Sequence, residues 1–265
     1  TASPIMAEKL SRWKRQPVSK ARVKAQALKE FMSTKERVVV MGHKITDVDA
    51  LGAAIGIYRA GKTLGKPVHI VVNDPSTSIR PLMAGYLNNP DYEPSMFIDK
   101  NQLMELVDNN TVVVVVDTNK PSYTECQELL YMTKTIVVLD HHRRGNEIIQ
   151  NAVLSYVEPY ASSTCEMVAE VLQYIADGIK LIRRADAMYA GIVIDTQNFT
   201  NQTGVRTFEA AAFFKKKRRG HHQGAQAFQG EYEGLPGKGG RGQEGGGVHG
   251  VPLPSASAQP KGWRV

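Results

Sequence analysis

The chain has 265 residues, of which 42% are hydrophobic, and it carries a formal net charge of +7. This length and apolar content suit a soluble globular protein with one large or two small domains. The charge is uneven: residues 1–30 and 215–265 each carry a net +6, which leaves −5 for residues 31–214 and argues against a net-positive nucleic-acid groove across the core.

The first half of the chain predicts alternating helices and strands. Residues 19–33 are expected to form a helix with Val23, Ala27, Leu28 and Phe31 on one face. A buried strand at 37–41 leads through a loop into a helix whose small residues permit close packing on a sheet: Gly52, Ala53, Ala54 and Gly56. The elements expected next are a strand at 67–72, a helix within 76–88, a helix at 100–108 and a strand at 111–117.

The second half continues the alternation. We expect a helix at 121–132 that begins at Pro121, a strand at 135–140, a strand near 153–159, and helices at 162–176, about 183–194 and 205–217. Ser163 and Glu166 have the spacing of a capping box. The near-continuous Val and Ile runs predict an α/β fold with a parallel sheet and helices on both faces.

The composition changes after Lys217. Residues 215–265 hold thirteen of the 23 glycines and show no apolar period, so they cannot bury enough surface to offset their ordering entropy. We therefore expect a basic linker helix at 1–35, one domain at 36–217 and a disordered tail at 218–265.

Residues that can bind metals follow four predicted elements, at the edge where parallel strands end and ligands bind. They lie in GHKITDVD with His43, Asp47 and Asp49, VVVVVDTN with Asp117, LDHHRR with Asp140, His141 and His142, and GIVIDTQNF with Asp195. Three apolar strands thus deliver carboxylates or imidazoles to one edge, and a helix adds another acid.

Each segment alone has an ordinary explanation, because an Asp after a strand is commonly a helix N-cap and a lone His is more often structural than a ligand. The occurrence of all four segments at one edge of the sheet argues for metals. Gathered carboxylates raise one another's pKa, and a pair of divalent cations removes that conflict. Asp and His donors without Cys favour Mn²⁺, Mg²⁺ or Fe²⁺. The pattern predicts a two-metal phosphoryl-transfer site with six ligands: His43, Asp47, Asp49, Asp117, His141 and Asp195.

The same segments resemble the DHH phosphoesterase superfamily. GHKITDVDALGAAIGI, VVDTNKPSYTE, LDHHRR, YVEPYASSTCEMVAE and AGIVIDTQNFTNQTGVRTFEAAAFF are similar to GdpP-type cyclic di-AMP phosphodiesterases. The resemblance covers about residues 20–217, and it includes the lead-in helix KARVKAQALKEF.

The resemblance implies individual roles that the residues alone leave open. One Mn²⁺ would be held by His43, Asp47 and Asp117, and the other by Asp49, Asp117, His141 and Asp195, with Asp117 bridging; Mg²⁺ is the alternative metal. Asp140 would orient a ligand histidine. His142 would be catalytic and face the scissile phosphate. Further candidates for substrate contact are Arg143, Arg144, Arg206 and Ser163; a solvated loop explains the first two equally well, and helix capping explains Ser163 better.

The chain departs from that family at both ends. Members carry transmembrane helices, a PAS-like sensor and a degenerate GGDEF domain before this region and a DHHA1 domain after it. Here the chain opens with TASPIM, without an initiator Met, so we expect an interior fragment. The abrupt change of composition after AAFFKKK indicates that the tail comes from a shifted reading frame or from an error in the gene boundaries.

The expected function is hydrolysis of cyclic di-AMP to linear pApA by a two-metal phosphodiesterase, impaired by loss of the DHHA1 domain. The alternatives are a short-oligonucleotide phosphodiesterase and a non-catalytic metal- and nucleotide-binding remnant. We expect a cyclic dinucleotide substrate and no stable nucleic-acid complex, and leave a homodimer open. No apolar run is long enough to cross a bilayer, and the two cysteines, Cys126 and Cys165, form no framework, so we expect a reduced, cytosolic compartment for this fragment. The resemblance implies a membrane-anchored parent with this fragment on its cytoplasmic side.

Overall fold

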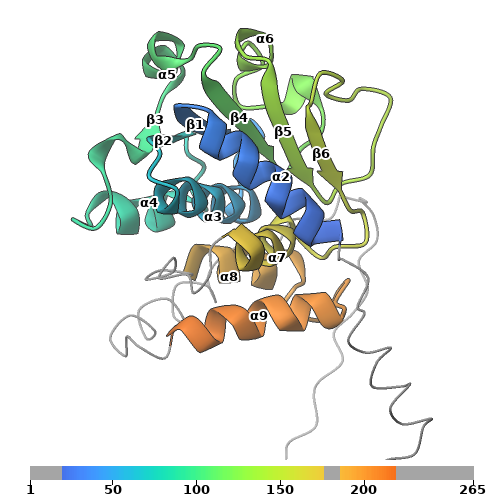
Figure 1. Cartoon of the computed structure of the whole chain (residues 1–265). Helices are drawn as coiled ribbons and strands as arrows, with labels where there is room; N and C mark the ends of the chain where they lie inside the picture. The colour runs from blue at the N-terminus through green and yellow to red at the C-terminus, as the bar shows by residue number, and fades with distance from the viewer. Residues whose placement is uncertain (1–19, 176–185, 219–265) are drawn as a thin grey trace, which may run out of the picture. The chain divides into compact units, whose positions relative to one another are not determined.

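A computed structural model describes residues 20–175 and 186–218 (Figure 1). Side chains are described up to residue 214. Three predicted segments therefore lie wholly or partly outside the described residues. They are residues 1–19 of the linker helix, the start of the helix expected at about 183, and the tail from residue 219.

Six strands form one parallel sheet in the order β3-β2-β1-β4-β5-β6. Their bounds are β1 Arg37–Met41, β2 Val68–Val71, β3 Phe97–Ile98, β4 Thr111–Val116, β5 Thr135–Asp140 and β6 Leu154–Val157. The strand order reverses between β1 and β4, which are neighbours in register from Arg37 beside Thr111 to Met41 beside Val115. In open α/β sheets such a reversal opens a crevice at the carboxyl ends of the two strands.

Both faces of the sheet are buried, which explains why its strands are apolar without alternation. One face is covered by α2 Lys20–Thr34, α3 Val48–Thr63 and α7 Thr164–Ile175, and the other by α5 Lys100–Leu106 and α6 Leu129–Met132 (Figure 1). A further layer, α8 Asp186–Asp195 and α9 Val205–Arg218, packs against α3 and α7. The remaining elements are α4 Arg80–Leu87 and the 3₁₀ turns η1 Pro94–Met96 and η2 Pro121–Tyr123. The predicted α/β fold with helices on both faces is confirmed.

The helix predicted over 121–132 is wrong as a continuous element. Only η2 and the short α6 are helical there. Between them Thr124 pairs with His43, and the amide of Glu125 donates to the carbonyl of Gly42 at 2.9 Å. These backbone bonds tie the segment to the loop after β1, so helical hydrogen bonding cannot continue through it.

Helix α2 forms where predicted, but its buried face is rotated from the expected one. Val23 is 57% exposed, whereas Ala21, Ala25, Leu28 and Met32 are buried. Ala27 and Phe31 lie at the margin of the core. The buried side chains follow the positions that face α7 and β6, the elements against which α2 packs.

Two glycines of α3, Gly52 and Gly56, face neighbouring helices and not the sheet. A Cβ added at Gly52 would lie 2.7 Å from the carbonyl oxygen of Ala187 on α8 and 2.7 Å from Sγ of Cys165 on α7. A Cβ at Gly56 would meet Val168 and Met188 on the same two helices. The expectation that these glycines approach the sheet is therefore corrected: they allow α7 and α8 to approach α3.

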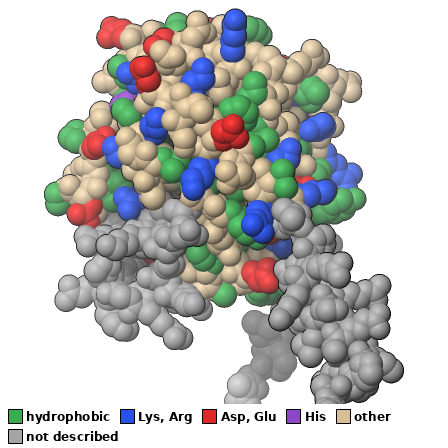
Figure 2. Space-filling model, in the orientation of Figure 1, with side chains coloured by type: hydrophobic (Ala, Val, Ile, Leu, Met, Phe, Trp, Pro, Cys, Tyr) green, Lys and Arg blue, Asp and Glu red, His purple; other side chains and the backbone are tan. Residues whose placement is uncertain are grey.

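On the face of the molecule drawn in Figure 2, the Lys and Arg side chains of the described residues are scattered among acidic and apolar ones. No helix in the described part of the chain is long and apolar enough to cross a membrane.

Replacing Gly52 by Ala should destabilise the fold, because the new methyl group meets a backbone carbonyl that cannot rotate away. Overpacking of this kind costs about 1–3 kcal/mol of unfolding free energy. Gly204→Ala is the matched control, since nothing lies within 4 Å of its added Cβ. Urea denaturation of both variants measures the difference, and equal stability of the two would contradict the packing described for α3.

Candidate metal centre

The loop after β1 brings His43 and Asp47 together. His43 is held by its bridge to Thr124, and its Nε2 lies 3.6 Å from Oδ1 of Asp47. Asp47 is also the N-cap of α3, where the same oxygen accepts from the amides of Asp49 and Ala50 at 3.1 Å. The structural role of Asp47 as a cap and its place in the cluster are thus compatible.

Asp49 lies in the first turn of α3 and is 1% exposed. Its two oxygens accept from the backbone amides at the start of α7, from Thr164 at 2.7 Å and from Cys165 at 2.9 Å. The partial positive charge of a helix N-terminus stabilises a carboxylate placed there. A Cβ at Gly191 would be 3.0 Å from Cα of Asp49, so a glycine on α8 is what lets that helix approach the acid.

Asp117 stands at the centre of the cluster, directly after β4. Its Oδ2 is 3.5 Å from Nε2 of His43, and its Oδ1 is 3.4 Å from Nε2 of His141 and 3.6 Å from Nδ1 of His142. Thr164 donates its hydroxyl to the same Oδ1 at 3.0 Å. The backbone of Asp117 has a φ of 59°, a left-handed conformation that Asp and Asn adopt more readily than other side chains.

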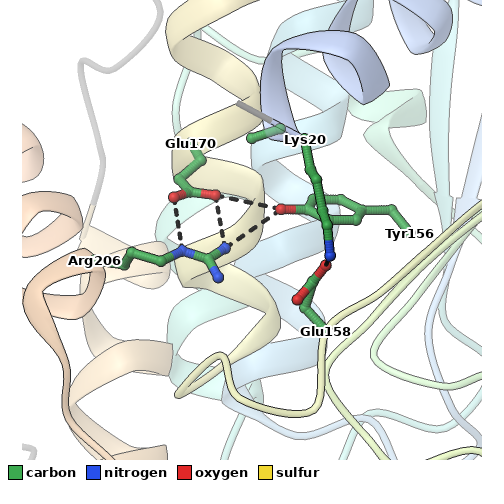
Figure 3. A pocket seen from close by; sticks show the side chains of 6 residues that line it. Lys20, Tyr156, Glu158, Glu170 and Arg206 are labelled. Carbon is green, nitrogen blue, oxygen red and sulfur yellow. Dashed lines mark hydrogen bonds and ion pairs between the residues drawn. The ribbon is translucent and has the colours of Figure 1, made fainter. Parts of the chain in front are cut away.

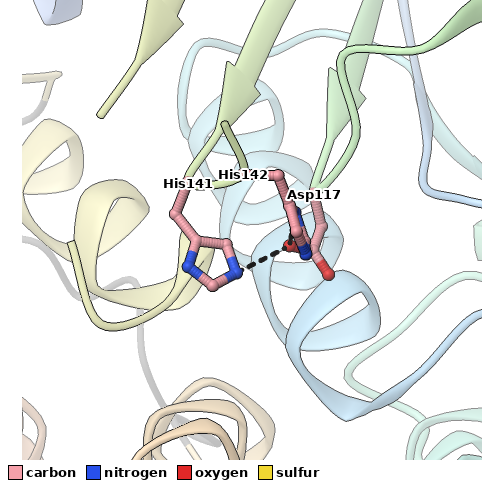
Figure 4. Close-up of side chains that lie close together, drawn as sticks. All are labelled: Asp117, His141 and His142. Carbon is pink, nitrogen blue, oxygen red and sulfur yellow. Dashed lines mark ion pairs between the residues drawn. The ribbon is translucent and has the colours of Figure 1, made fainter. Parts of the chain in front are cut away.

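The two histidines after β5 both lie beside Asp117 (Figure 4) but differ in their other neighbours. The ring of His141 is largely buried, and its Nε2 lies 3.5 Å from Asp195 and 3.9 Å from Asp49. The side chain of His142 is 54% exposed, and its Nδ1 lies 2.9 Å from Oδ1 of the fully buried Asp140. The histidine that Asp140 contacts is therefore His142.

Three sets of side chains have ligand atoms within 4.8 Å of one another and could hold a metal ion. The structure brings all six predicted ligands, together with His142, into these sets: His43, Asp47 and Asp117; Asp49, His141 and Asp195; Asp117, His141 and His142. Asp117 belongs to two of them. The last acid, Asp195, arrives as the final residue of α8.

The pKa values reflect how strongly these charges interact. Burial disfavours the charged form of His43, but the hydrogen bonds and charges of Asp117 and Asp47 together outweigh this and raise the pKa of His43 to about 10. The same balance raises the pKa of His141 to about 9. Burial alone would raise the pKa of Asp117, yet His141 and His43 hold it well below its ordinary value. Burial, with the charges of Asp117 and Asp195, raises the pKa of Asp49 well above its ordinary value.

The candidates for substrate contact lie in two kinds of place. Arg143 and Arg144 are exposed in the loop next to His142, and Arg144 donates to Oγ of Ser155 at 3.1 Å. Arg206 instead forms a two-bond ion pair with Glu170, at 2.7 and 2.8 Å, in the wall of a cavity that Lys20, Tyr156 and Glu158 also line (Figure 3).

Ser163 is fully buried and caps α7, since its Oγ accepts from the amide of Glu166 at 3.1 Å. The carboxylate of Glu166 in turn accepts hydrogen bonds from the amide and the hydroxyl of Ser162. The capping-box spacing of Ser163 and Glu166 therefore does serve to begin the helix.

Two polar residues that hydrogen-bond to the acids of the site were not predicted from the sequence. Thr164 contacts both Asp49 and Asp117, and Asn119 donates to Asp140 and to the carbonyl of His142. Thr164 could have been suspected from its place after two serines at a helix start, but its partners are 115 and 47 residues away. For Asn119 the only indication was its position two residues after Asp117.

Residues 37–192 match the model of the DHH family, N-terminal domain. The chain belongs to the DHH family. It is 41% identical over 201 residues to the cyclic-di-AMP phosphodiesterase GdpP of Bacillus subtilis (strain 168), a match covering 75% of this chain and 30% of that protein. It is 37% identical over 200 residues to the cyclic-di-AMP phosphodiesterase PdeA of Listeria monocytogenes serotype 1/2a (strain 10403S), covering 74% and 30%.

Among solved structures, this DHH-family chain resembles an exopolyphosphatase-related protein from Bacteroides fragilis with a TM-score of 0.60 at 18% identity, covering 74% of this chain and 57% of that one. This likeness supports the fold. The predicted resemblance to GdpP-type proteins is confirmed by the identities above, and the chain spans about 30% of the length of those two relatives.

The raised pKa values of His43 and His141 predict how stability depends on pH in the metal-free protein. Between the unfolded pKa near 6.5 and the folded values of about 9 and 10, the folded state keeps protons that the unfolded state has lost. The free energy of unfolding should therefore fall as the pH rises through this range. Denaturation in a chelator at pH 6.5, 8 and 9.5 measures the slope. His43→Gln should flatten it, and a wild-type stability that stays level would contradict the assigned protonation.

Proposed function

We propose that this chain is the catalytic part of a two-metal phosphodiesterase that opens cyclic di-AMP to linear pApA. One observation carries the proposal: the carboxylate of Asp117 lies between two sets of potential ligands, with its Oδ2 on the side of His43 and its Oδ1 on the side of His141. A carboxylate with this placement is suited to bridge two cations.

The donor set fits divalent cations. His43, Asp47 and Asp117 form one set, and Asp49, His141 and Asp195 form a second that Asp117 completes. All donors are carboxylate oxygens or imidazole nitrogens, the ligands that suit Mn²⁺, with Mg²⁺ as the alternative. Burial, together with the charges of Asp117 and Asp195, raises the pKa of Asp49, and cations bound beside it would favour its charged form.

The side chains of this chain would hold and orient the reacting groups. When bound, the cations supply Lewis-acid chemistry, which neutralises phosphate charge and lowers the pKa of a water. Thr164 holds the carboxylates of Asp49 and Asp117 in place. His142, more than half exposed beside them, is available to contact the scissile phosphate or its leaving oxygen. Arg143 and Arg144, exposed in the same loop, supply positive charge for the substrate phosphates.

The relatives support the choice of substrate, since both phosphodiesterases are named for cyclic di-AMP. A short-oligonucleotide phosphodiesterase would use the same ligands, so the assay must include linear pApA as a competing substrate. We keep as a prediction from the resemblance that the parent protein is anchored at the cell membrane, with this part on its cytoplasmic side; a homodimer is left open.

Replacing Asp117 by Asn tests the bridging role. Asn retains the shape and tolerates the left-handed backbone at this position, whereas Ala would add strain. The variant should fold, bind one Mn²⁺ or none in place of two, and lose hydrolysis of cyclic di-AMP. Titration calorimetry measures the metal, and chromatography of released pApA measures the activity.

Asp74→Asn is the control for loss of one carboxylate, because Asp74 is 95% exposed and its partner is the surface Arg80. It should behave as wild type in both measurements. Two unaltered Mn²⁺ sites in Asp117→Asn would remove the basis of the proposal. Faster cleavage of pApA than of cyclic di-AMP by the wild-type chain would favour the oligonucleotide alternative.

Replacing His142 by Ala separates catalysis from metal binding. As a group that faces the phosphate, His142 should contribute roughly 3–4 kcal/mol to the transition state, so kcat should fall about 10²- to 10³-fold with the bound metal unchanged. His141→Ala should instead lose metal, since His141 contacts three carboxylates. Metal loss in both variants would make His142 a ligand, as its place in one of the three sets allows.

A further inference from the structure

The side chain of Asn119 is buried beneath His142 and binds two parts of the loop that carries it. Asn119 is 5% exposed. Its Nδ2 donates to Oδ2 of Asp140 in a short hydrogen bond and to the carbonyl of His142 at 3.3 Å. Its own backbone carbonyl accepts from the amide of Ile149 at 2.9 Å, where the same loop returns. Asn119 therefore contacts this loop near its start and at its end.

The orientation of this amide is determined by its neighbours. A carboxylate and a carbonyl can only accept hydrogen bonds, so the nitrogen of Asn119 has to face Asp140 and His142. Its oxygen, Oδ1, is left buried and without a donor among the described residues. A buried acceptor without a partner normally costs a protein stability, so stability alone does not account for an asparagine here.

Asp140 explains what the amide does. This carboxylate is fully buried, and its two oxygens have separate partners. Oδ1 accepts from the amide and from Nδ1 of His142, at 3.1 and 2.9 Å, whereas Oδ2 accepts from Asn119. Because the carboxylate accepts only, Nδ1 of His142 carries a proton in this contact, and Nε2 is the nitrogen left for another partner. Without Asn119, Oδ2 would lose its bond, and the plane of the carboxylate would be held only through the bonds to Oδ1.

We propose that Asn119 is a positioning residue that fixes the ring of His142 through Asp140. The inference rests on the proposed function, because it assigns Asn119 to the step in which His142 contacts the phosphate. The hydrogen bonds described for Asn119 go to Asp140, His142 and Ile149, none of which is among the six proposed metal ligands, so its loss should alter the chemical step and spare metal binding.

The test compares Asn119→Ala, His142→Ala and the double variant in the full 265-residue chain loaded with Mn²⁺. Losing a residue that orients a catalytic group typically costs 10- to 100-fold in activity. We expect kcat for cyclic di-AMP to fall by about that factor in Asn119→Ala, with KM and bound Mn²⁺ unchanged. In the His142→Ala background the same substitution should cost nothing further, because its effect passes through that ring. Losses that multiply in the double variant, or a change confined to KM, would overturn the assignment.

Two further variants guard against a trivial loss of structure. Asn119→Asp has the same shape but sets a second carboxylate against Asp140, so it should also lower kcat. Asn151→Ala is the control: Asn151 also donates its side-chain nitrogen to a backbone carbonyl, that of Leu130 in α6 at 2.7 Å. It should retain the wild-type kcat, and an equal loss in Asn151→Ala would reduce the role of Asn119 to general support of the fold.

A measurement without substrate separates this inference from the proposed function. In ¹⁵N-labelled, metal-free chain, the ring Nδ1–H of His142 should give a signal protected by Asp140, and Asn119→Ala should abolish it. If the wild-type chain hydrolyses no phosphodiester but the signal depends on Asn119, the proposed function fails and the positioning role stands. If the chain is active and the signal persists in Asn119→Ala, the positioning role fails alone.

Discussion

A group of buried carboxylates at one edge of a sheet is the constraint on which this structure depends. Like charges brought together away from water repel, and each raises the pKa of the next unless something compensates. Here the compensation comes from three imidazoles around Asp117 and from two helix N-termini. Asp47 caps α3, and Asp49 binds the first amides of α7. Much of the fold around the site can be understood as the means of holding these acids.

The topology decides where that compensation is available. The reversal of strand order between β1 and β4 sets His43 and Asp117 side by side, although 74 residues separate them, and β5 adds the two histidines from the next strand. Helix α8 contributes the remaining acid. Gly52 and Gly191 allow α8 to approach α3, which brings Asp195 within 3.5 Å of His141. The glycines of this packing therefore serve the site as well as the core.

The sequence predicted the parts of the molecule that local pattern controls. The Val and Ile runs located β1, β4 and β5, because a strand buried on both faces is apolar throughout. The polar residues that follow these runs could therefore be assigned to one edge of the sheet. The expected helix at 121–132 failed, because long-range backbone bonds to Gly42 and His43 outweighed the helical pattern. Thr164 and Asn119 were missed for the same reason: their roles depend on partners that no local pattern reveals.

The site also divides its polar residues according to what they face. His141 is surrounded by Asp49, Asp117 and Asp195, and its ring is 13% exposed, so its nitrogen is committed to the interior. His142, the next residue, turns one nitrogen to Asp140 and leaves more than half of its side chain exposed. Adjacent residues of one loop thus present one imidazole to the acids and another to the crevice. The buried Asp140 supports this division, because it lies 2.9 Å from Nδ1 of His142, closer than the 3.6 Å that separates the same nitrogen from Asp117.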